Sequence, residues 1–196
     1  MRQLLVVFLF VVVLTGSVMA EQGTLRVFAI GGRQLDNHWH IASVNFIKKM
    51  STGMNAWSFI GPRYKFGADN QHFVDFFLGY TFPEGKSGSY TLSPRLFLTL
   101  NQFSVWQDLE WYPETKSIYI ATVVKWKVPL VKGLSIGADV ETFIPDYSEP
   151  ESEAIIHGGP LIAYSLSENM AVGFTWHDRK ADFGGDFVRT TLKFFL

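Results

Sequence analysis

The chain has 196 residues, with 17 Lys and Arg against 18 Asp and Glu, and it contains no cysteine. A nucleic-acid-binding surface would need a large excess of basic residues, so this balance argues against one. Without cysteine, the chain can form neither disulfide bonds nor a thiol nucleophile.

Residues 1–20 have the pattern of a secretory signal peptide. Arg2 precedes an apolar run that ends at Leu14, and Val18 and Ala20 form the small-x-small pattern of a cleavage site. A membrane anchor would need about 20 apolar residues, which is more than this run supplies. We therefore expect an exported protein that is cleaved after Ala20. No later stretch is apolar for the length of a membrane helix, so a helical membrane protein is excluded.

Ten segments after the signal peptide alternate between apolar and polar residues, as β-strands with two different faces do. Most are close to the 9–11 residues that a tilted strand needs to cross a bilayer, whereas strands of soluble proteins average about 5–6 residues. The pattern therefore predicts an all-β fold, an antiparallel up-and-down transmembrane β-barrel over residues 38–196. The predicted strands are 38–48, 55–66, 72–82, 90–101, 102–112, 116–128, 133–143, 154–166, 169–177 and 186–196.

Residues 21–37 lie between the signal peptide and the first of these strands. Leu25, Val27 and Ala29 alternate with their neighbours and would suit an extra strand. An extra strand would give eleven, and bacterial single-chain barrels have an even number of strands. Of the three alternatives, an extra strand, a short periplasmic arm and part of a longer first strand, we favour the arm.

The connections between the ten strands fall into two sets, one on the whole longer than the other. Outer-membrane barrels have longer outer loops and short periplasmic turns. An even strand number would place both ends of the barrel on the periplasmic side. The expected outer connections are 50–55, 83–89, 113–115, 144–153 and 178–185. The expected periplasmic turns are 67–71, 101–102, 129–132 and 167–168.

The segment 186–196 continues as a strand to the last residue, with Val188, Leu192 and Phe194 on one face. The ends of soluble domains tend to fray. A barrel in lipid must instead pair its last strand with its first, because an open edge would leave backbone groups unpaired in hydrocarbon. We expect this segment to close the barrel.

One face of the strands is rich in Leu, Ile, Val and Phe, with Tyr and Trp near several strand ends. Aromatic rings in these places suit the two interfacial girdles of a membrane barrel. A soluble, lipocalin-like periplasmic barrel would show the same alternation, with its apolar face turned inward. The expected interfacial aromatics are Tyr64, Tyr80, Trp111, Trp126, Tyr164 and Trp176.

The other face carries opposite charges that would meet across neighbouring strands. A two-residue turn at 101–102 would set Arg95 opposite Asp108, and a loop near Asp69 would set Arg63 opposite Asp75. A charge left unpaired in a closed lumen costs several kcal/mol, so these charges should be paired. Long side chains on this face would crowd a narrow barrel and argue against a wide pore. The expected lumen charge network is Arg63, Asp75, Arg95, Asp108, Lys125, Asp139 and Glu141.

Two groups of residues are candidates for chemistry. His38 and His40 would share a strand face and could approach one metal ion, but no third ligand has matching spacing. His177 and Asp178 lie near the outer end of a strand, where a lipid-modifying barrel enzyme would hold its base, but no serine can be tied to His177 by spacing. We expect no metal, no cofactor and no enzymatic activity.

The terminal strand, the alternation and the loop asymmetry together resemble the small bacterial outer-membrane β-barrels, including OmpA- and OmpW-like proteins. The resemblance covers residues 38–196 and implies outer-membrane lipid and the barrel-assembly machinery as partners. Members of this superfamily usually end in an aromatic residue, whereas this chain ends in Leu196 after Phe194 and Phe195. The expected role is a narrow small-solute channel or a structural membrane protein. The lipid-modifying enzyme and the lipocalin-like binding barrel remain as alternatives.

Overall fold

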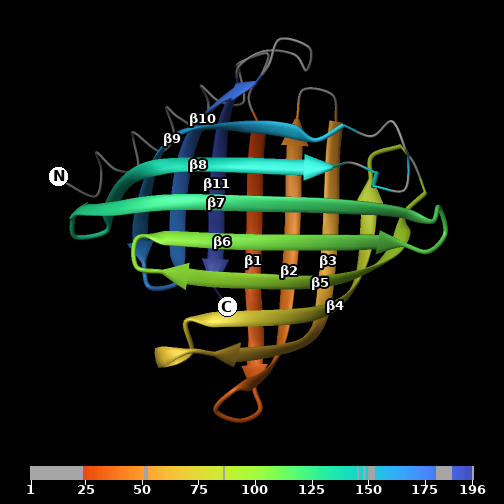
Figure 1. Cartoon of the computed structure of the whole chain (residues 1–196), viewed down its shortest axis with the longest axis horizontal. Coiled ribbons are helices and arrows are strands. Elements are labelled where there is room, and N and C mark those ends of the chain that lie inside the picture. Colours follow the sequence, from red (N-terminus) through yellow and green to blue (C-terminus); the bar gives the residue numbers. More distant parts are fainter. Residues whose placement is uncertain are drawn as a thin grey trace.

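The computed structural model describes residues 24–50, 53–85, 87–144, 146–147, 149, 153–179 and 187–195. Within these ranges the chain forms eleven strands that close into one barrel (Figure 1). The predicted signal peptide and its cleavage site lie outside the described residues. The strands are β1 Thr24–Gln34, β2 Trp39–Met50, β3 Gly53–Phe66, β4 His72–Pro83, β5 Ser89–Leu100, β6 Phe103–Tyr112, β7 Ser117–Val131, β8 Leu134–Ile144, β9 Ile155–Ser167, β10 Met170–Arg179 and β11 Phe187–Phe195, with a short 3₁₀ turn at Ala68–Asn70.

The predicted barrel is confirmed, and each of the ten predicted strands is present with its ends displaced by at most a few residues. Period-2 alternation located the strands because each of them has two different environments, one on either side of the sheet. Among the residues that the structure describes, no helix is long and apolar enough to span a membrane.

The favoured arm at 21–37 is wrong, because Thr24–Gln34 form an eleventh strand. β1 pairs antiparallel with β2 and parallel with β11, from Thr24 opposite Arg189 to Ile30 opposite Phe195. The two strands of this seam lie side by side and point the same way in Figure 1. The barrel is therefore mixed rather than purely antiparallel. An even strand number is not physically required, since a parallel pair also satisfies the backbone groups of both edges.

Because the number of strands is odd, the start of β1 and the end of β11 lie at opposite ends of the barrel. β1 begins at the barrel end with the generally longer connections, and β11 finishes at the other end, which we call the short-turn end. Placing both ends of the barrel on one side was therefore wrong, although the two predicted sets of connections do gather at opposite ends. At the short-turn end, Asn101 and Gln102 form the predicted two-residue turn, with Asn101 at a φ of 55°. Asn tolerates this left-handed conformation better than most residues do.

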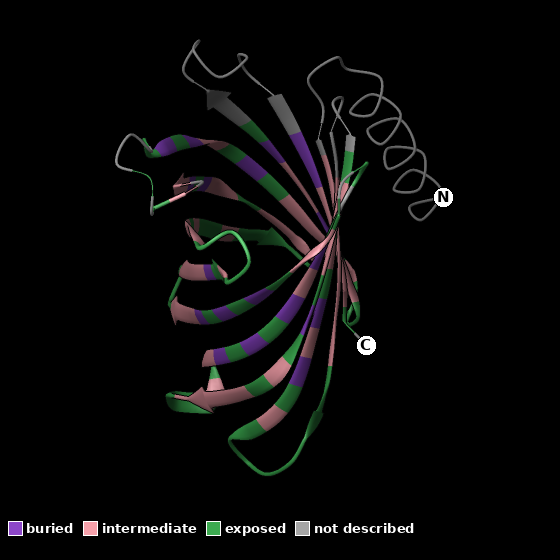
Figure 2. Ribbon diagram, turned by 90° about the vertical axis from the view of Figure 1, so that its right-hand side faces the viewer, coloured by how far each residue is buried: buried purple, intermediate pink, exposed green. Residues whose placement is uncertain are grey.

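The outer face of the barrel is apolar and the inner face is largely polar. Outward side chains such as Ile60, Phe76 and Leu78 are more than half exposed, whereas inward Asp75 and Asp139 are each 1% exposed. The alternation of buried and exposed residues along the strands is visible in Figure 2. A lipocalin-like barrel would have the opposite polarity, so this arrangement does not favour that alternative.

Apolar side chains fill one part of the interior, on β1 to β4. Ala42, Val44, Phe59 and Phe77 form a buried cluster, against which Phe28, Ile30 and Trp57 pack. The Phe28 and Phe46 rings stack at 4.5 Å between centroids, and Phe46 stacks on Trp57 at 4.9 Å. Most of the charged inner side chains lie on β3 to β11, and Arg26 of β1 joins them.

Gly137 on β8 lies at a close approach between β8 and β7. A Cβ atom there would lie 1.8 Å from the Trp126 carbonyl oxygen of β7, whereas one at Gly173 on β10 would lie 3.7 Å from its nearest neighbour. We expect Gly137→Ala to destabilise the folded barrel by about 1–3 kcal/mol. Gly173→Ala should stay within about 0.5 kcal/mol of the parent. Urea unfolding of both variants refolded in detergent measures the difference, and equal stabilities would contradict the predicted close approach.

Candidate functional site

The candidate site is the charged inner wall of the barrel, where ionisable side chains form two clusters. Strands β3 to β6 carry the first ion cluster, and strands β1, β7 to β9 and β11 carry the second. The first ion cluster consists of Arg63, Asp75, Arg95, Asp108 and Glu110. The second ion cluster consists of Arg26, Lys125, Asp139, Glu141, His157 and Arg189.

Arg63 and Asp75 form a two-bond ion pair across β3 and β4. Arg63 Nε lies 2.6 Å from Asp75 Oδ1, and Nη2 lies 2.8 Å from Oδ2. The two residues are direct partners in the strand register, so the pairing follows from the backbone. The guanidinium also lies 3.8 Å from the centre of the Phe73 ring. Such paired, charge-assisted bonds are strong and geometrically specific.

Arg95 on β5 joins two carboxylates of β6. Its Nε lies 3.0 Å from Asp108 Oδ1, and its Nη2 lies 3.4 Å from Glu110 Oε1. Ser93 Oγ donates to Asp108 at 2.8 Å and accepts from Arg95 Nε at 2.8 Å. The guanidinium lies 3.8 Å from the centre of the Phe59 ring, which places it against the apolar cluster. Arg95 therefore connects the charged and apolar parts of the interior.

Glu141 on β8 is the centre of the second ion cluster. Its carboxylate binds Arg26 of β1, with Arg26 Nη1 3.1 Å from Oε1, and it also binds Arg189 of β11. His157 Nε2 of β9 lies 3.7 Å from Oε2. Arg26 and Arg189 come from the two strands of the parallel seam. One buried carboxylate of β8 thus connects both strands of the seam.

Asp139, two residues before Glu141, is held in a similar way. Lys125 Nζ lies 3.2 Å from Asp139 Oδ2, and Thr175 donates a hydrogen bond to the same oxygen at 3.3 Å. Lys125 and Asp139 are direct partners in the register of β7 and β8. The carboxylate is thereby compensated in a place where it is almost entirely removed from solvent.

All seven residues of the predicted lumen charge network face the interior, and the predicted registers of Arg63 with Asp75 and Arg95 with Asp108 are confirmed. The predicted network did not include four members of the two ion clusters: Arg26, Glu110, His157 and Arg189. The alternation of residues could have identified two of these. Glu110 is two residues from Asp108 on the same face of β6, and His157 lies on the inward face of β9. Arg26 is absent from the predicted network because residues 21–37 were predicted to form a periplasmic arm rather than a strand of the barrel.

The six predicted interfacial aromatics all lie on the outer face and divide between the two barrel ends. Tyr64, Trp126 and Tyr164 are near the short-turn end. Tyr80, Trp111 and Trp176 are near the opposite end. The two groups are where girdles would lie, while their contact with a membrane interface stays a prediction.

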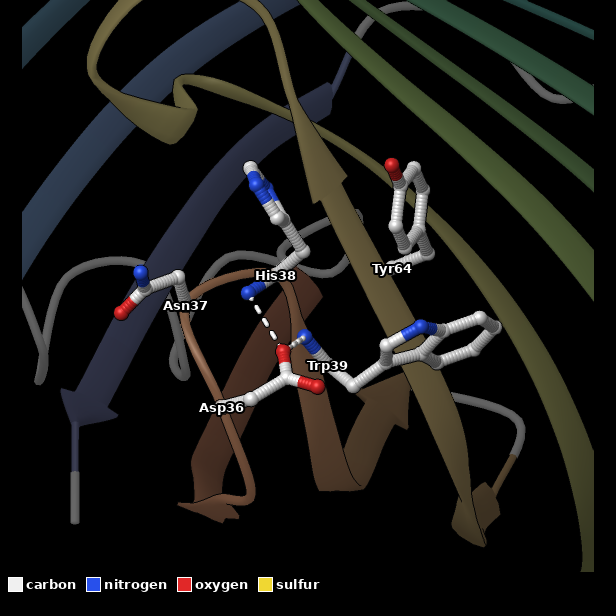
Figure 3. Close-up of a pocket in the computed structure, with 5 residues that line it drawn as sticks. All are labelled: Asp36, Asn37, His38, Trp39 and Tyr64. Carbon is white, nitrogen blue, oxygen red and sulfur yellow. Dashed lines mark hydrogen bonds between the residues drawn. The ribbon is translucent and has the colours of Figure 1, made fainter.

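A surface pocket of about 480 Å³ lies at the short-turn end, lined by Asp36, Asn37, His38, Trp39 and Tyr64. Asp36 Oδ1 accepts hydrogen bonds from the backbone N–H groups of His38 and Trp39, each at 2.7 Å (Figure 3). These two bonds hold the pKa of the Asp36 carboxyl below its usual value. The carboxylate therefore stabilises the turn between β1 and β2, which accounts for its position without a ligand.

Of the two candidate groups for chemistry, only His38 and His40 lie in the described part of the chain with their side chains, and they do not share a strand face. His38 lies in the turn before β2, where its Nδ1 is 3.1 Å from the Lys65 carbonyl oxygen, so it does not share a strand with His40. Within the described ranges, no three His, Asp or Glu side chains are arranged to hold a metal ion. The side chains of His177 and Asp178 and residues 180–186 lie outside the described residues.

No protein-family model matches the chain, and no curated protein matches it. The resemblance to OmpA- and OmpW-like barrels therefore stays a prediction from the sequence. Function has to be inferred from the geometry of this barrel.

The Arg63–Asp75 pair allows a double-mutant test of the charge network. Asp75→Ala should destabilise the barrel by about 3–5 kcal/mol, because it leaves the mostly buried Arg63 guanidinium without its carboxylate. Adding Arg63→Met should recover part of that loss, giving a coupling energy of about 1–3 kcal/mol. Urea unfolding of the refolded variants measures each value.

Glu114→Ala, in the exposed turn between β6 and β7, is the control for loss of one negative charge. Its effect should be below about 0.5 kcal/mol. Strictly additive losses in the Arg63 and Asp75 variants would show that the pair makes no net contribution to stability.

Proposed function

We propose that this chain is an integral outer-membrane β-barrel with a narrow, side-chain-filled interior, serving as a structural membrane protein rather than an open pore. The observation that carries the proposal is the polarity of the barrel, with apolar side chains outside and paired charges inside. In this proposal the outer face contacts outer-membrane lipid, and the barrel-assembly machinery inserts the chain.

The apolar outer surface supports a membrane environment. Large outward side chains are exposed on strands all round the barrel, and a contiguous apolar surface of this kind marks contact with a membrane or a partner. The exposed outward residues include Ile41, Ile60, Phe76, Leu78, Leu92, Val124, Ile136, Val140, Ile156, Ile162 and Trp176. A closed sheet also leaves no backbone edge unpaired, which the hydrocarbon core requires.

Burial of the inner charges supports a narrow interior. Arg95, Arg189, Asp139 and Glu141 are each at most 5% exposed, so these charges are almost entirely removed from solvent. These residues come from β5, β8 and β11, and the Phe59 and Phe77 rings lie beside the Arg95 guanidinium. A wide aqueous channel would leave inner charges hydrated. The rim-located hydrolase has no comparable support, because the His177 side chain lies outside the described residues.

Lysine substitution on the outer face tests the membrane environment. Leu78 lies near the middle of β4 and is 53% exposed, while Leu130 lies near the short-turn end of β7 and is 52% exposed. In phospholipid vesicles, Leu78→Lys should cost about 2–4 kcal/mol and Leu130→Lys about 0–1 kcal/mol, because the cost of a charge depends on its depth. Urea unfolding followed by tryptophan fluorescence measures both. Two equally small losses would mean that the outer face contacts water.

Conductance in a planar bilayer tests the narrow interior. We expect the folded barrel to insert and to show no large, discrete conductance steps. Removing the Arg95 side chain with Arg95→Ala should open space between Asp108 and Phe59 and produce measurable steps. Large steps from the parent protein would overturn the closed interior and favour a small-solute channel.

A further inference from the structure

The surface pocket at the short-turn end combines aromatic rings with a carboxylate. Its lining residues are Asp36, Asn37, His38, Trp39 and Tyr64. Trp39 and Tyr64 are direct partners in the register of β2 and β3, and their ring centres are 5.0 Å apart at an interplanar angle of 54°. Because the rings are tilted, each keeps part of its face open, and Trp39 is 42% exposed.

A third ring adjoins this pair. The His38 ring centre lies 5.7 Å from that of Tyr64, at an interplanar angle of 38°. Its Nδ1 is 3.1 Å from the Lys65 carbonyl oxygen, and this contact holds the ring beside the end of β3. The rings of His38, Tyr64 and Trp39 therefore form a continuous group next to the turn that contains Asp36 (Figure 3).

The turn between β1 and β2 uses only one oxygen of the Asp36 carboxylate. The backbone hydrogen bonds from His38 and Trp39 both end on Oδ1, and Oδ2 takes no part in them (Figure 3). The lowered pKa of this carboxyl keeps it ionised at neutral pH. An ionised oxygen beside aromatic rings attracts a cation, since the ring faces carry negative partial charge.

We propose that the pocket binds a substituted ammonium group, with Trp39 and Tyr64 contributing ring faces and Asp36 contributing the opposite charge. Aromatic rings are the recurrent recognition surface for such groups, because they attract the charge and also contact its apolar methyl or methylene groups. A metal ion suits the pocket less well, since no three His, Asp or Glu side chains of the described ranges are arranged to hold one.

The position of the pocket favours a phospholipid headgroup as the source of the ammonium group. Trp39 and Tyr64 lie on the outer face at the short-turn end, where a lipid surface would meet the barrel. Ile41 and Ile60 are exposed on the same face, on the same two strands, and offer a surface for acyl chains. This choice of source rests on the proposed membrane location, whereas the binding of an ammonium group does not.

The test is a titration of the refolded parent barrel with glycerophosphocholine in maltoside detergent, which contains no ammonium group, at constant ionic strength. The NMR signals of the His38 and Tyr64 backbone amides should shift and saturate. Asp36→Asn keeps an oxygen for the turn but removes the charge, and it should weaken binding about fivefold. Trp39→Leu should weaken binding about two- to fivefold, because it removes one ring face.

Two variants at the same end of the barrel are the controls. Glu168→Gln, in the exposed turn between β9 and β10, removes one negative charge, and Trp126→Leu removes one outward ring. Both should bind glycerophosphocholine as the parent does. A parent that shows no saturable shift would overturn the site, and so would controls that lose as much affinity as Asp36→Asn and Trp39→Leu.

A titration with short-chain phosphatidylcholine distinguishes a lipid headgroup from a free solute. The same amide signals should shift at a lower headgroup concentration than with glycerophosphocholine, and Asp36→Asn should weaken both interactions. Equal affinities, or lipid binding that Asp36→Asn leaves unchanged, would overturn phospholipid as the source. If the Leu78→Lys test shows that the outer face contacts water while glycerophosphocholine still binds, the membrane location fails and the site stands.

Discussion

The closure of the sheet on itself is the constraint on which the rest of this structure depends. A strand with a free edge exposes a row of unpaired N–H and C=O groups, and the parallel pairing of β1 with β11 removes the last such edge. This seam has fewer paired residues than the neighbouring β1–β2 ladder. Glu141 compensates by binding one arginine from each seam strand. A side chain of β8 thus connects the two strands of the parallel seam.

Closure also determines the chemistry of the interior. Once eleven two-faced strands form a barrel, one face of each must share a confined space, and here that face carries most of the buried charge. Removing a charge from water is costly, and direct pairing across the register is the simplest way to offset the cost. Arg63 with Asp75 and Lys125 with Asp139 follow this rule. Aromatic rings that pack against the Arg63 and Arg95 guanidinium groups fill the remaining space.

Local sequence patterns predicted the strands themselves and the register between strands that are neighbours in the sequence. Alternation located ten strands, and the two-residue turn at Asn101 fixed the register that places Arg95 opposite Asp108. The seam could not be predicted in this way, because β1 and β11 are at opposite ends of the sequence and no turn connects them. Contacts across the barrel, such as Arg26 with Glu141, were inaccessible for the same reason. These contacts depend on the number of strands and on their stagger. The predicted strands began at residue 38 and omitted β1, so the predicted number was too small.

The parallel seam also decides where the two ends of the polypeptide emerge. In an antiparallel meander with an even number of strands, both ends leave from the same rim, whereas here β1 starts at one rim and β11 finishes at the other. If the barrel spans a bilayer, peptides fused before β1 and after β11 would be displayed in different compartments.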